Sequence, residues 1–170
     1  MIHTLSVLIE NRPGALARVS NMFARRGYNI ESLAVGPTER PDVSRITLRV
    51  DCSVHSLEQI VKQMHKLVNV LRVNELEAET AVERELALIK VSAPPDKRAE
   101  LLALAEVFNA RVADLGPDSI VFEVVGPPEE LDSFQELVRP HGVKELVRTG
   151  RIGLGRSSLK KAPAKQHALR

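Results

Sequence analysis

The stretch that decides the fold is HTLSVLIE (3–10), NRPG (11–14) and ALARVSNMFARRG (15–27). Its first eight residues form a short run of aliphatic and β-branched side chains that predicts a strand, and NRPG is a turn signal. From Ala15, apolar residues recur at the three- and four-residue spacing of one helix face until Gly27 ends the pattern; they are Leu16, Val19, Met22 and Phe23. The stretch therefore predicts a strand, a turn and an amphipathic helix.

The residues that follow complete a first unit. Residues 28–36 and 43–52 read as two strands of a hairpin, because the second alternates through Ile46, Leu48 and Val50. Ser56 is a candidate cap for a helix over 57–68, whose apolar residues keep helical spacing. Residues 70–79 form a fourth strand. In the β4-β1-β3-β2 strand order that this topology normally adopts, 28–36 is an edge strand with few charges, which favours pairing with a second copy.

The same order of elements recurs in the second half. Residues 85–92 predict a strand, Pro94-Pro95 opens a helix, 111–115 and 119–125 form a hairpin, Pro127-Pro128 opens another helix, and 143–149 is the last strand. Both halves read β-α-β-β-α-β, which is the ferredoxin-like arrangement. The prediction is an α+β protein with domains at 1–80 and 81–152 and a basic, disordered tail at 153–170. One such unit buries little apolar area, so we expect dimerisation or pairing of the repeats.

Composition places the chain among ordinary globular proteins. Of its 170 residues, 44% are hydrophobic and 27% charged. No run approaches the roughly 18 apolar residues that span a bilayer, and the first residues lack a signal-peptide pattern, so a cytoplasmic location without membrane contact is expected. Cys52 is the single cysteine, which excludes an intrachain disulfide and predicts a buried or half-buried thiol on a strand.

The charge is unevenly distributed. Residues 151–170 carry six basic residues and no acid, whereas residues 1–150 hold 18 basic and 22 acidic residues. Nucleic-acid binding requires a concentrated basic face, which residues 1–150 are not expected to offer, so no nucleic-acid partner is expected. A solvated end is favoured for the tail over weak polyanion binding. Gly153-Leu154-Gly155 resembles a phosphate loop only superficially, because no helix follows it, and it is interpreted as a flexible linker.

The sequence offers no catalytic constellation. Its five histidines share no metal-binding spacing with each other or with carboxylates, and no serine lies in a Gly-x-Ser-x-Gly setting. The acidic pair Glu129-Glu130 lies at a predicted helix start, where it stabilises the helix dipole. We expect no catalytic residue and no metal site in this chain.

The turn before the first helix is the candidate binding site. A helix start exposes unpaired N–H groups that can receive a carboxylate, and Gly14 lets a ligand approach the backbone. Asn11 can accept a hydrogen bond from an ammonium group. The alternative is that Asn11 caps the helix and Pro13 starts it. The equivalent stretch of the second half, SAPPDK (92–97), has neither glycine nor asparagine, so the fold alone does not demand the first pattern.

Several strings resemble one family. NRPGAL (11–16), RRGYNIESL (25–33) and SRITL (44–48) are similar to the amino-terminal ACT domain of the small, regulatory subunit of acetolactate synthase. The resemblance continues through EQIVKQMHKLVNVLRV (58–73), VEREL (82–86) and GRIGLGR (150–156). The resemblance covers nearly the whole chain, but residues 93–100 and 127–132 match the family pattern only in the type of residue.

The resemblance implies a non-catalytic subunit that binds and activates a large catalytic subunit and confers feedback inhibition by a branched-chain amino acid, usually valine. Thiamine diphosphate, Mg and FAD would belong to that partner, with no cofactor in this chain. The effector would lie between two ACT domains of a homodimer. The implied effector-binding residues are Asn11, Gly14, Ala15 and Leu16 of one copy, Asn29 and Ile30 of its partner, and Ala34 and Val35, where changes relieve feedback in relatives.

The residues themselves agree with an apolar amino acid as effector. Leu16, Ile30, Leu33 and Val35 could surround an aliphatic side chain, and the two asparagines offer neutral polar groups. Valine, leucine and isoleucine are not distinguished, because side chains one methylene apart differ by only about 1–3 kcal/mol in such a pocket.

Three other functions are compatible with parts of the same pattern. A stand-alone ACT module controlling another enzyme or a transcription factor would keep the 11–16 site but would not need the second repeat. RNA-recognition modules share the element order but stack bases on aromatic residues, and strands 3–10 and 43–52 have none. A small enzyme of this fold lacks a nucleophile or acid–base pair.

Overall fold

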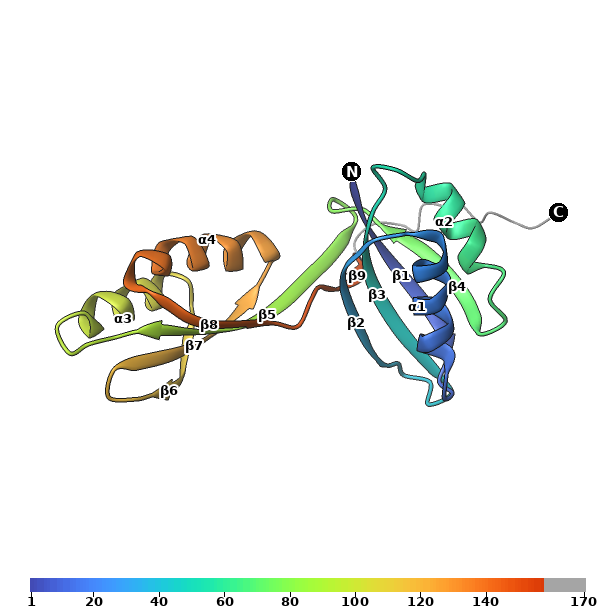
Figure 1. Ribbon diagram of the computed structural model, residues 1–170. Coiled ribbons are helices and arrows are strands. Elements are labelled where there is room, and N and C mark those ends of the chain that lie inside the picture. Colours follow the sequence, from blue (N-terminus) through green and yellow to red (C-terminus); the bar gives the residue numbers. More distant parts are fainter. Residues whose placement is uncertain (158–170) are drawn as a thin grey trace. The chain divides into compact units, whose positions relative to one another are not determined.

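The computed structural model describes residues 1–157, which form two compact units (Figure 1). Unit 1 comprises Met1–Val82 and the described residues from Arg151 onward, and unit 2 is Glu83–Gly150. Each unit has a four-stranded antiparallel β-α-β-β-α-β core. The predicted α+β class with two ferredoxin-like units is confirmed.

Unit 1 consists of six elements before its C-terminal strand: β1 (Ile2–Glu10), α1 (Ala15–Arg26), β2 (Ile30–Pro37), β3 (Val43–Asp51), α2 (Leu57–Met64) and β4 (Val70–Leu76). The sheet order is β2-β3-β1-β4, as predicted, so β2 is an edge strand. Alternate residues of β1 and β3 form the core beneath the helices: Leu5 opposes Leu48, and Val7 opposes Ile46. Figure 1 shows α1 and α2 on the same face of this sheet.

Helix α2 is shorter than the apolar pattern predicts. It begins after Ser56, whose hydroxyl accepts a hydrogen bond from the Gln59 N–H at 3.3 Å, so the predicted cap is confirmed. It ends at Met64, because the chain then turns through bonds from Leu67 N–H to the Met64 carbonyl and from Val70 N–H to the Leu67 carbonyl. The extension to Val68 was wrong, and that side chain is 82% exposed.

Unit 2 repeats the arrangement with β5 (Ala81–Ser92), α3 (Arg98–Val107), β6 (Arg111–Leu115), β7 (Ser119–Gly126), α4 (Pro128–Val138), a 3-10 turn η1 (Arg139–His141) and β8 (Val143–Arg148). Its strand order is β6-β7-β5-β8. Helix α3 starts three residues after the prolines, which lie in a turn closed by Lys97 N–H donating to the Pro94 carbonyl. Arg98 fixes that turn by donating to the carbonyls of Ala93, Gly116 and Pro117.

Ile152–Gly155 is a strand, β9, and not a flexible linker. It pairs with β5, and Arg156 N–H donates to the Thr80 carbonyl at 2.8 Å. In this strand Ile152 and Leu154 alternate with Gly153 and Gly155, so side chains project from one face only, a period-two pattern that is compatible with a strand. The expected domain end at 152 therefore differs from the structure, where β9 belongs to unit 1. Residues 158–170 of the predicted tail lie outside the described residues.

Cys52 follows the last residue of β3 and is half buried. Its N–H donates to the Met1 carbonyl at 2.8 Å. Burial raises the pKa of the Cys52 thiol, which lowers its thiolate fraction at neutral pH. The side chain is thus a poor nucleophile, in line with its expected role as a structural thiol.

Candidate effector site

The turn between β1 and α1 is held by the loop that joins β2 to β3. Asn11 N–H donates to the Asp42 carbonyl at 2.8 Å, and Asn11 Nδ2 donates to the Pro41 carbonyl at 3.0 Å. That loop is itself closed by Arg40, whose guanidinium contacts the Asp42 carboxylate at 2.7 Å. The same hydrogen bond lowers the pKa of the Asp42 carboxyl group, which stays ionised at neutral pH. Asn11 is therefore oriented by a segment thirty residues away.

Asn11 does not cap α1. The N-cap residue is Gly14, which has no side-chain capping bond and adopts the left-handed conformation with φ 82° and ψ −6°. The alternative in which Asn11 caps the helix is thus wrong. Asn11 Nδ2 is engaged with Pro41, and among residues 1–157 no donor is hydrogen-bonded to the Asn11 Oδ1 atom.

The start of α1 has free hydrogen-bond donors. Ala15 N–H donates to the Arg12 carbonyl at 3.2 Å and Arg18 N–H to the Gly14 carbonyl at 3.0 Å, but Leu16 and Ala17 N–H have no acceptor within the described chain. A Cβ placed on Gly14 would meet no atom within 4 Å. Free N–H groups beside open space at a helix N-terminus attract a carboxylate.

Two of the predicted turn residues serve the fold as well. The positive φ of Gly14 favours glycine at this position through the backbone conformation alone, whether or not a ligand binds. Ala15 is 2% exposed and its side chain packs in the core, so only its backbone lies at the turn. Leu16 is partly buried against the core and leaves some of its side chain beside the turn.

The strand residues of the predicted site lie along β2. Ile30 opposes Val50 and Val35 opposes Ile46, which places both on the helix-covered face of the sheet. Ala34 opposes Thr47 and lies on the other face. Asn29 immediately precedes the strand, is exposed, and accepts a backbone bond from Asp51 N–H at 3.3 Å.

One chain does not bring the two groups of residues together. Strands β1 and β2 are both antiparallel to β3, so they run in the same direction. Ile30 is level with the start of β1, because both Ile30 and His3 oppose Val50, whereas Asn11 follows the end of β1. Seven residues of strand separate the two ends, or about 23 Å. Asn11–Leu16 and Asn29–Ile30 thus occupy opposite ends of one sheet.

Sequence reasoning missed the loop at Pro41 and Asp42 as a support of the site. The strand order contains the signal, because it places the β2–β3 connection at the same end of the sheet as the end of β1.

Within the described residues, no group of three histidine, cysteine or carboxylate side chains is arranged to hold a metal ion. None of the described helices has the length and apolar character needed to cross a membrane.

Comparison with known proteins decides the family. Residues 5–72 match the family described as the AHAS small subunit-like ACT domain, and residues 84–157 match the small subunit of acetolactate synthase. The chain belongs to the acetolactate synthase small-subunit family. The two matches cover both units, which the stand-alone ACT module would not need.

Relatives from this family align with the chain over nearly their full length. The probable acetolactate synthase small subunit of Archaeoglobus fulgidus is 48% identical over 94% of this chain and 100% of its own length. The small subunit of Mycolicibacterium smegmatis is 46% identical over 91% of each chain. The crystal structure of the small subunit from Thermotoga maritima superposes with a TM-score of 0.85 at 37% identity, covering 94% and 99% of the two chains. Membership in this family implies a regulatory role and a catalytic partner subunit.

Proposed function

We propose that the chain binds and activates the catalytic subunit of acetolactate synthase and makes it sensitive to feedback inhibition by a branched-chain amino acid, with valine as the leading candidate. The observation that carries the proposal is the open start of α1, where unpaired N–H groups border the exposed Gly14 backbone. Thiamine diphosphate, Mg and FAD remain expected in the catalytic partner.

The geometry suits a zwitterionic amino acid. The free N–H groups of Leu16 and Ala17 can donate to the effector carboxylate, and Asn11 Oδ1 can accept from its ammonium group. Leu16 offers apolar surface for the side chain. Because Asn11 is neutral, the site does not call for a charged effector side chain.

A second copy would complete the site. If two β2 edges pair antiparallel with Ala34 at the centre, the partner's Ile30 lies opposite Thr38, beside the turn that holds Asn11. Asn11–Leu16 of one copy and Asn29–Ile30 of the other, which lie at opposite ends of the sheet within one chain, then meet across the interface. This is the reason for proposing a homodimer with two effector sites.

The dimer proposal predicts a stable pair in solution. Val35 is 49% exposed on β2, and Val35→Glu should raise the dimer dissociation constant at least about ten-fold by placing two carboxylates in the interface. Val54→Glu, at an exposed position outside the strands, is the matched control and should leave the dimer intact. Sedimentation equilibrium measures both. A monomeric wild-type chain at micromolar concentration, with and without valine, would contradict the arrangement.

Reconstitution tests the function directly. The purified chain should turn over no pyruvate, and adding it to the catalytic subunit should increase acetolactate formation several-fold. Valine should then lower the rate only in the reconstituted enzyme, and parallel titrations with leucine and isoleucine identify the preferred effector. Acetolactate formation by the chain alone, or no effect on the catalytic subunit, would refute the proposal.

A further inference from the structure

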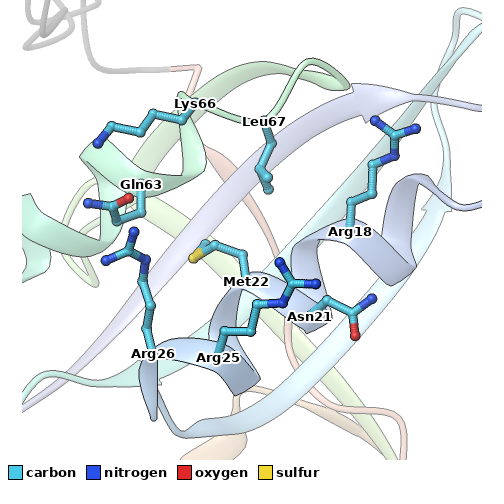
Figure 2. Close-up of a pocket in the computed structure, with 8 residues that line it drawn as sticks. All are labelled: Arg18, Asn21, Met22, Arg25, Arg26, Gln63, Lys66 and Leu67. Atoms are coloured by element: carbon cyan, nitrogen blue, oxygen red, sulfur yellow. The ribbon is translucent and has the colours of Figure 1, made fainter.

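A groove of about 510 Å³ lies between α1 and the end of α2, on the helix side of unit 1 (Figure 2). Figure 2 shows Met22 and Leu67 between the basic side chains that surround them. The lining residues are Arg18, Asn21, Met22, Arg25, Arg26, Gln63, Lys66 and Leu67. No residue of the turn at Asn11–Gly14 lines the groove, and the groove residue nearest to that turn is Arg18, whose N–H donates to the Gly14 carbonyl.

The groove carries four positive charges and no negative one. Arg18, Arg25, Arg26 and Lys66 are all exposed, and none has an ion-pair or hydrogen-bond partner among residues 1–157. By contrast, two other exposed basic groups of unit 1 are paired with carboxylates, Arg40 with Asp42 and Lys62 with Glu58. Residues 1–150 are acidic in sum, so the groove is a local reversal of the body's charge.

Cations that repel one another at close range favour an anionic partner. Small-molecule sites usually enclose most of their ligand, whereas this groove is open and its four charged groups are exposed. Apolar groups beneath a ring of charge are typical of protein interfaces, where charged rims steer the partner and apolar contacts hold it. These features favour a macromolecular surface over a small anion.

We propose that this groove docks an acidic segment of the catalytic subunit, an inference that rests on the proposed function. The groove uses residues of α1 and of the segment from Gln63 to Leu67, whereas the proposed dimer uses β2, so the two surfaces share no residue. Helix α1 then begins directly after the effector turn and lines the docking groove from Arg18 to Arg26. Occupancy of one end can thereby act on the other through a single rigid helix.

Charge reversal in the groove tests the proposal. Arg25→Glu/Lys66→Glu should raise the dissociation constant for the catalytic subunit at least about ten-fold at low salt, and the salt dependence of binding should become shallower. Arg25 lies in the last turn of α1, where a cation stabilises the helix, so thermal melting and dimer mass are recorded in parallel. Arg25→Gln/Lys66→Gln should give an intermediate loss without introducing an acid.

The matched control is Arg72→Glu, at an exposed basic residue of β4 outside the groove, which is compared with the single groove variant Lys66→Glu because both make the same change of charge in unit 1. It should leave affinity for the catalytic subunit within about two-fold. The docking assignment would be overturned if groove and control variants weakened binding equally, or if a folded groove variant kept its affinity for the catalytic subunit. Binding and activation by the wild-type chain would still support the proposed function in either case. Saturable binding of inorganic pyrophosphate that the groove variant loses, with unchanged affinity for the catalytic subunit, would overturn it in favour of a small-anion site.

Discussion

Gly14→Asp is expected to raise the valine concentration that half-inhibits the reconstituted enzyme by about 100-fold or more, equivalent to ~2.7 kcal/mol of binding free energy. The new carboxylate would stand where the effector carboxylate meets the free N–H groups of Leu16 and Ala17. It would occupy those donors and repel the ligand. Activation of the catalytic subunit should be retained, because the basic groove proposed to contact that subunit does not include residue 14.

The left-handed conformation of Gly14 requires a control for backbone strain. Any side chain at φ 82° costs about 1 kcal/mol, although aspartate and asparagine tolerate this region better than other residues. Gly14→Asn is therefore the matched variant, with the same shape and no charge, and should weaken inhibition less than about ten-fold. Inhibition curves for valine on both reconstituted variants make the comparison. An unchanged half-inhibiting concentration for Gly14→Asp, or equal losses in the two variants, would remove the electrostatic role assigned to this turn.

Local pattern was sufficient to predict the sheets. The alternation of Leu5, Val7 and Ile9 defines the buried face of β1. Pairing with β3 is restricted to registers that place the apolar residues of both strands on the same face of the sheet. The edge position of β2 followed from topology alone. The ends of helices were predicted less accurately. At α2, apolar residues continue past Met64, where the chain must turn to enter β4.

Features that depend on distant residues could not be predicted. Glycine adopts either sign of φ, so the sequence left the conformation of Gly14 open. Whether Asn11 caps α1 or bonds to Pro41 depends on a loop thirty residues away. The groove was missed because Arg18 and Arg25 resemble an ordinary solvated helix face until the turn after α2 places Lys66 at the same groove. The spacing of the site residues along the chain likewise gave no sign that they lie at opposite ends of the sheet.

A buried ion pair in unit 2 was missed for the same reason. Glu85 on β5 is 7% exposed, and its two carboxylate oxygens accept from Arg148 Nε at 3.0 Å and Arg148 Nη2 at 2.7 Å. The remaining guanidinium nitrogen donates to Asp132 at the surface. These hydrogen bonds raise the pKa of Arg148 further above its ordinary value, so the cation is permanent.

Arg148→Met is expected to destabilise unit 2 by about 3 kcal/mol, because it leaves the buried carboxylate of Glu85 without its bidentate partner. The value is at the low end for broken buried pairs, since a quarter of the Arg148 side chain already reaches water. Glu85→Leu/Arg148→Met should recover most of the loss, because no charge is then left unpaired. Arg139→Met, which removes an exposed pair with Glu136, should cost less than about 0.5 kcal/mol.

Hydrogen exchange separates this effect from the rest of the molecule. The chain contains two units and need not unfold in one step, so a single melting temperature would mix their stabilities. Amides of β7 around Phe122 report on unit 2, and amides of β3 around Leu48 report on unit 1 within the same sample. Protection should fall by about 100-fold in β7 and remain unchanged in β3. Equal losses in both strands would mean that the pair stabilises the whole chain, and no loss in β7 would show that water replaces Arg148 at Glu85.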